Sequence, residues 1–97
     1  MIRRVEVSRL ALKQLRKAPQ HVAAKLLAWK EDVEQRGVEE VRKVPGFNDH
    51  PLKGDLAGKR AIRLSLQWRA VYEVRSTRDG GVLVEFVEVQ EVHPHDY

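Results

Sequence analysis

Side chains suited to proton transfer and phosphate binding gather in the second half of this chain. The last five residues, His93-Pro94-His95-Asp96-Tyr97, bring two imidazoles and a phenol together. An imidazole exchanges a proton near neutral pH, and arginines on neighbouring strands would add fixed positive charge. A phosphodiester-cleaving site needs an acid, a base and a cation, so we expect such a site here.

The charges of the chain are unevenly distributed around a formal net charge of +4. Residues 53 to 78 contain seven Lys or Arg residues against Asp55 and Glu73, whereas residues 79 to 97 contain five acidic residues and no Lys or Arg. This polarity favours a nucleic acid or another polyanion as partner, bound beside carboxylates. The plainer interpretation is that these Lys and Arg side chains only solvate exposed strand faces.

Length and composition limit the class of protein. The 97 residues fit one domain, 1–97, and a hydrophobic content of 42% is enough for one modest core. The chain has no cysteine, no signal-peptide pattern and no long apolar run, so we expect a cytoplasmic protein without a membrane partner. The spacing of His93, His95 and Asp96 fits no established zinc or nickel site, so we expect no metal and no cofactor.

The first half of the chain has helical periodicity. Residues 3–7 alternate as a short strand, and Ser8 is well placed to cap a helix over 9–17 that Pro19 ends. A second helix then runs to Gly37, with an apolar stripe at helical spacing in which Trp29 is expected to be a core residue. Residues 38–58 form a connector with one possible helical turn over 38–44.

The second half has strand periodicity. Apolar residues alternate over 61–66 and 68–74, and a run over 82–92 follows the turn at Asp79-Gly80-Gly81. The last run has apolar residues on both faces, which places it inside the sheet. We therefore expect an α+β fold, with two N-terminal helices on one face of a mainly antiparallel four-stranded sheet.

Several segments carry a family resemblance. They are His50-Pro51-Leu52-Lys53-Gly54, Arg60-Ala61-Ile62-Arg63-Leu64, Trp68-Arg69-Ala70-Val71-Tyr72-Glu73-Val74 and the closing His-Asp-Tyr. In this order they resemble the RelE/HigB/YoeB toxins of type II toxin–antitoxin modules, within the RelE/ParE superfamily, over the whole chain. The resemblance implies a RelE-like fold, endonucleolytic cleavage of mRNA in the A site of the 70S ribosome, inhibited translation and a cognate antitoxin protein as partner.

The resemblance also assigns roles to residues. Arg69 matches the family arginine that contacts the scissile phosphate, and Tyr97 matches a terminal tyrosine that stacks on a base or assists proton transfer. Without a metal, a base would take the proton of the RNA 2′-hydroxyl and an acid would protonate the 5′ leaving oxygen, giving a 2′,3′-cyclic phosphate. The expected catalytic residues are Arg63, Arg69, Glu91, His95 and Tyr97, and the expected RNA-binding residues are Lys53, Lys59, Arg60, Tyr72 and His93.

Alternatives remain open at this point. His93 could replace His95 as the acid, and Glu88 could replace Glu91 as the base. The final strand has Gln90-Glu91-Val92-His93 where some ribosome-dependent relatives have lysines or arginines, so a histidine acid is favoured. ParE-like toxins share this architecture and poison DNA gyrase by protein contact, and a degenerate member would only bind its antitoxin.

Overall fold

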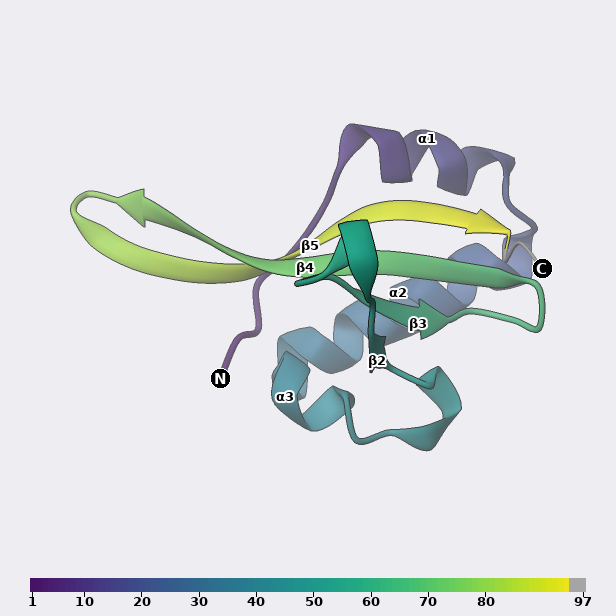
Figure 1. The fold of residues 1–97 in the computed structure, drawn as a ribbon, viewed down its shortest axis with the longest axis horizontal. Coiled ribbons are helices and arrows are strands. Elements are labelled where there is room, and N and C mark those ends of the chain that lie inside the picture. The colour runs from purple at the N-terminus through teal and green to yellow at the C-terminus, as the bar shows by residue number, and fades with distance from the viewer. Residues whose placement is uncertain (95–97) are drawn as a thin grey trace.

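The described part of the chain forms three α-helices and one five-stranded sheet (Figure 1). The computed structural model describes residues 1–94. The helices and strands, in chain order, are β1 (Val5–Val7), α1 (Arg9–Lys17), α2 (Gln20–Arg36), α3 (Val38–Val41), β2 (His50–Pro51), β3 (Arg60–Arg63), β4 (Trp68–Asp79) and β5 (Val82–Pro94), with 3-10 turns η1 (Pro45–Phe47) and η2 (Gly54–Leu56) in the connector.

The sheet has the strand order β1-β5-β4-β3-β2. Strands β3, β4 and β5 form the predicted antiparallel meander, and β5 lies inside the sheet as expected. The prediction of four strands was wrong, because the two-residue strand β2 adds to β3 as a fifth strand. Strand β1, which was expected over residues 3–7, is present and pairs with β5 in parallel. Parallel pairing across such a long connection leaves no local sequence signal, and two residues are too few for an alternation.

The helices begin and end close to the predicted residues. The side chain of Ser8 caps α1 by accepting a hydrogen bond from the Ala11 amide, 3.1 Å away. Gly37 follows α2 with a positive φ of 87°, a conformation that favours glycine. The third helix, α3, occupies part of the segment where one helical turn was expected.

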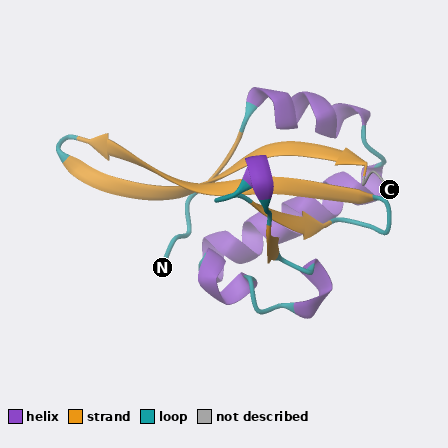
Figure 2. Cartoon of the chain, viewed as in Figure 1, coloured by secondary structure: helices purple, strands orange, loops and turns teal. Residues whose placement is uncertain are grey.

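One hydrophobic core joins the helices to the sheet. Trp29 and Tyr72 are both 0% exposed and their ring centroids are 5.2 Å apart, so they anchor α2 to β4. Figures 1 and 2 show α2 behind the sheet and α1 alongside β5. The strand residues in this core share one face of the sheet, and they are Val5, Ile62, Ala70, Tyr72, Val87, Val89 and Val92.

A β-bulge sets which residues of β5 point into this core. Val71 pairs with Glu91 and Tyr72 pairs with Val89, so Gln90 is an extra residue without a partner in the register. The Gln90 carbonyl accepts a hydrogen bond from the Ser8 hydroxyl at 3.0 Å. Because of this extra residue, Val89 faces the core together with Val92, although the two are an odd number of positions, three, apart.

A buried polar group lies at the edge of the core, below β3 and β4. The Asp49 carboxylate accepts hydrogen bonds from Arg60 Nε and from the Tyr72 hydroxyl, each at 2.6 Å. Arg42 Nε donates to the same hydroxyl at 3.2 Å. Burial and the Asp49 hydrogen bond raise the pKa of Tyr72 to about 12, so this phenol stays protonated and donates.

Replacement of Ser8 by alanine is expected to lower the free energy of unfolding by about 1–2 kcal/mol, because the Ala11 amide loses its cap. Ser76 is an exposed strand serine, so Ser76→Ala is the control. Urea unfolding of both variants measures the difference. Equal stability of the two variants would contradict the capping role.

Stability should also fall at high pH because of Tyr72. Its folded pKa of about 12 exceeds the ordinary value of 10.0, so the stabilisation is complete below pH 10 and is lost as pH rises towards 12. The loss is on the order of 3 kcal/mol relative to Tyr72→Phe, which has no phenol to ionise. Urea unfolding of both proteins between pH 9 and 12 measures it, and parallel stability curves would contradict it.

Candidate active site

A row of three basic side chains crosses the sheet on the face opposite the core. Arg69 on β4 pairs directly with Arg63 on β3 and with His93 on β5. Side chains that are directly opposite in a sheet point to the same face and lie close together. The register therefore brings together three of the residues that the sequence predicted for the site.

Arg69 is the central member of this row and carries an uncompensated charge. Its side chain is half-buried, its Nε atom is buried without a hydrogen-bond partner, and it forms no ion pair with any of residues 1–94. Two other arginines of the sheet are paired, since Arg60 contacts Asp49 at 2.6 Å and Arg75 contacts Glu88 at 3.2 Å. A partly buried guanidinium without a partner favours binding of an anion.

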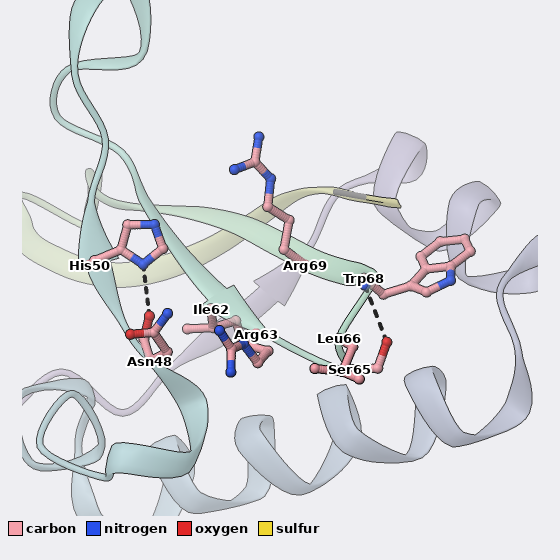
Figure 3. A pocket seen from close by; sticks show the side chains of 8 residues that line it. All are labelled: Asn48, His50, Ile62, Arg63, Ser65, Leu66, Trp68 and Arg69. Atoms are coloured by element: carbon pink, nitrogen blue, oxygen red, sulfur yellow. Dashed lines mark hydrogen bonds between the residues drawn. The ribbon is translucent and has the colours of Figure 1, made fainter. Parts of the chain in front are cut away.

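An open pocket of about 330 Å³ lies beside Arg69 (Figure 3). In the figure, the Arg69 side chain extends from β4 away from helix α2. Trp68 also contributes to the wall, but its side chain packs partly against the core, on the face of the sheet opposite Arg69. The lining residues are Asn48, His50, Ile62, Arg63, Ser65, Leu66, Trp68 and Arg69.

His50 is a site residue that the sequence reasoning did not select. Strand β2 places it opposite Ala61, so it joins the pocket from the edge of the sheet. Its Nδ1 atom lies 2.7 Å from the carbonyl oxygen of Asn48. If Nδ1 donates to that carbonyl, Nε2 is left unprotonated and can act as a base. The signal was present in the His50-Pro51 sequence, but a two-residue strand cannot be read from periodicity.

The two candidate carboxylate bases differ in their surroundings. Glu88 accepts hydrogen bonds from Gln90 at 3.0 Å and from Arg75 at 3.2 Å, and these contacts lower its pKa below the usual value. Glu91 lies opposite Val71, two pairs along from the pair of Arg69 and His93, and has no hydrogen bond or ion pair from its side chain to residues 1–94. Glu91 is therefore the better placed of the two to take a proton.

Two predicted RNA-binding residues lie on the wrong face of the sheet. Tyr72 is 0% exposed and packs on Trp29, so the expectation that it contacts RNA was wrong. Arg60 pairs with Tyr72 across the strands and is held by Asp49, so its guanidinium is not free for a phosphate. Both belong to the core-side network rather than to the open face.

The remaining predicted residues are spread around the pocket or lie outside the described part. Lys53 is exposed in the loop before η2, and Lys59 is half-exposed at the start of β3, where its charge contributes to the lowered pKa of Glu88. His93 Nδ1 lies 2.9 Å from the carbonyl oxygen of Pro94. His95 and Tyr97 lie outside the described residues, so their expected roles stay predictions.

Within residues 1–94, no three His, Asp or Glu side chains are arranged to hold a metal ion. Helices in the same range are too short or too polar to cross a bilayer.

Comparisons with known proteins agree on the architecture. No family model matches the sequence, and no curated protein matches it. Solved structures do match: a YoeB/ParE toxin from Agrobacterium tumefaciens has a TM-score of 0.67 at 18% identity, with 96% of this chain and 99% of that chain covered. YafQ from E. coli has a TM-score of 0.68 at 17% identity, with coverage of 95% and 92%.

A third similar structure was solved with a partner. It belongs to the RelBE2 toxin–antitoxin complex from Mycobacterium tuberculosis, with a TM-score of 0.64 at 19% identity, covering 98% of this chain and 100% of that chain. At these identities the comparisons establish the fold. The chain thus has the α+β fold shared by the YoeB, YafQ and RelE toxins.

Proposed function

We propose that this chain is the toxin of a type II toxin–antitoxin module and cleaves mRNA on the ribosome as a metal-independent endoribonuclease. The observation that carries the proposal is the row of Arg63, Arg69 and His93, with the Arg69 guanidinium unpaired beside an open pocket. A fold shared with toxins, one of them solved in a toxin–antitoxin complex, supports the same conclusion.

The chemistry follows from the charges on the open face. A base takes the proton of the RNA 2′-hydroxyl, and the resulting oxygen attacks the adjacent phosphorus. Arg69, assisted by Arg63, stabilises the negative charge that grows on the phosphoryl oxygens. The bond to the 5′ oxygen then breaks, an acid protonates that oxygen, and a 2′,3′-cyclic phosphate remains on the upstream fragment.

Four side chains are available for the two proton transfers. Glu91 and His50 lie on the open face of the described structure, and either can serve as the base. His93 lies next to Arg69 and can serve as the acid. His95 keeps the role of acid that the resemblance gives it, and Tyr97 keeps that of a stacking residue or an assistant in proton transfer.

The same open face would bind both the RNA and the antitoxin. Lys53 and Lys59 extend the positive charge beyond the row and would hold the RNA backbone. The cognate antitoxin would neutralise the toxin by covering the open face. These assignments place the protein in the cytoplasm, where mRNA is translated.

Arg69→Ala is expected to lower the rate of mRNA cleavage by about 100- to 1,000-fold, because one charge-stabilising group is removed from the transition state. Its thermal stability should stay at the wild-type level or rise, because the guanidinium has no partner among residues 1–94. Primer extension on a translated message measures the rate.

The matched control is Arg75→Ala, which removes an arginine from the same strand that is paired with Glu88. This variant should keep most of the wild-type rate. Full activity of Arg69→Ala, or an equal loss in both variants, would contradict the catalytic role of Arg69.

RNA binding should weaken steeply with salt if several phosphates are contacted. In single-stranded RNA each neutralised phosphate contributes about −0.7 to the slope of log affinity against log salt. If Arg63 contacts one phosphate, Arg63→Ala should make that slope less steep by about 0.7. Fluorescence anisotropy with a labelled oligonucleotide measures the affinity at each salt concentration. An unchanged slope would exclude Arg63 from phosphate binding.

The rival function is gyrase poisoning, since one similar structure is described as a YoeB/ParE toxin. A supercoiling assay with purified gyrase separates the two functions. Inhibited gyrase with intact message would favour the rival, and neither effect would indicate a degenerate toxin that only binds its antitoxin.

A further inference from the structure

We infer that Asp49 is a positioning residue, whose buried carboxylate fixes the place of His50 beside Arg63 and Arg69. This inference rests on the proposed function, because it assigns His50 to the proposed ribonuclease site. Asp49 is not among the catalytic or RNA-binding residues expected from the sequence. Its contacts, its burial and its place in the chain carry the argument.

The Asp49 carboxylate is the centre of the polar network below the sheet. Its side chain is 1% exposed, and its two oxygens accept separate hydrogen bonds of 2.6 Å from Arg60 and from the Tyr72 hydroxyl. Arg60 and Tyr72 are direct partners across β3 and β4. The carboxylate therefore fastens the connector to two strands at once, through short hydrogen bonds of which one is charge-assisted.

His50 follows Asp49 directly, at the start of β2. Successive side chains of a strand point to opposite faces, so an Asp49 side chain held on the core side directs His50 to the open side. The register agrees, because His50 lies opposite Ala61, which pairs with Val71 in the row next to Arg69. Fixing the Asp49 side chain thus fixes the backbone from which the imidazole extends.

The other contacts that hold this segment are backbone hydrogen bonds, such as those from the Leu52 amide to the Lys59 carbonyl at 2.9 Å and from the Asn48 amide to the Pro45 carbonyl at 3.0 Å. Strand β2 pairs with β3 through two residues only, and Asn48 before it adopts a left-handed conformation with φ of 46°. The Asn48 carbonyl lies 2.7 Å from His50 Nδ1, so the orientation of the ring depends on the orientation of this peptide unit. Release of the Asp49 anchor would allow the peptide unit and the ring to move together.

The first test reads the His50 imidazole by nitrogen NMR in the full-length wild-type protein and in Asp49→Asn. The wild-type ring should be protonated at Nδ1, towards the Asn48 carbonyl. In Asp49→Asn the neutral ring should shift towards protonation at Nε2, the form that a free imidazole prefers. Asp55→Ala is the control, because Asp55 is an exposed aspartate of the same connector, and it should leave the His50 signals unchanged.

A folded Asp49→Asn protein with wild-type His50 signals would overturn the inference. If Asp49→Asn does not fold, Tyr72→Phe removes only one of the two hydrogen bonds to the carboxylate and gives the same readout. A partial shift of the His50 signals is then expected, and none would overturn the inference. These signals do not depend on whether the protein cleaves RNA.

The second test is a double-mutant cycle on the cleavage rate. Asp49→Asn should lower kcat by about 100-fold with little change in KM, because the imidazole is misplaced while the RNA-binding arginines stay in position. In a His50→Ala background the same substitution should cause no further loss, since Asp49 acts through His50. A further 100-fold loss would overturn the inference. If the wild-type protein cleaves no RNA, the proposed function fails and the NMR signals alone decide the role of Asp49.

Discussion

The site depends on the register of β5 against β4, and that register depends on one extra residue. Gln90 bulges out of the pairing, so Val89 and Val92 both face the core while Glu91 and His93 face the open side. A slip of one residue would send His93 into the core and leave Arg69 without this neighbour. The Gln90 side-chain amide donates hydrogen bonds to Glu73 and Glu88, and the Gln90 backbone carbonyl accepts one from the Ser8 hydroxyl. The bulge is thus held through both its side chain and its backbone.

The two faces of the sheet differ in their electrostatic environment. On the core side the charges of Asp49 and Arg60 are paired and bonded, as burial requires. On the open side Arg63 and Arg69 lie next to each other without carboxylate partners among residues 1–94. Like charges in contact are unfavourable in the free protein, so a bound phosphate would relieve their repulsion. This difference separates the residues that build the site from those that do its chemistry.

Sequence patterns predicted the elements with strong local signals. The cap at Ser8, the stop at Gly37 and the alternation around Arg69 were enough to place both long helices and the meander. The parallel pairing of β1 with β5, the short strand β2 and the bulge at Gln90 depend on contacts between distant segments, so no local pattern reveals them, although the alternation over residues 3–7 did predict β1 itself as a strand. His50 was missed for the same reason.

The wrong assignments of Tyr72 and Arg60 could have been avoided. Arg69 and Tyr72 are three positions apart, as are Arg60 and Arg63, and an odd difference in position puts two strand residues on opposite faces. The spacing alone therefore excludes a shared surface for either pair. Which of the two faces the helices cover required the structure, where the contact between Trp29 and Tyr72 settles it.

The most direct test of the central claim is to identify the ends of mRNA in a cell-free translation reaction after the purified wild-type protein is added, with and without ribosomes. The account predicts ribosome-dependent cuts that leave a 2′,3′-cyclic phosphate on the upstream fragment and a 5′-hydroxyl on the downstream fragment. Intact message in the presence of active, folded protein would contradict it, and so would fragments with 5′-phosphate ends.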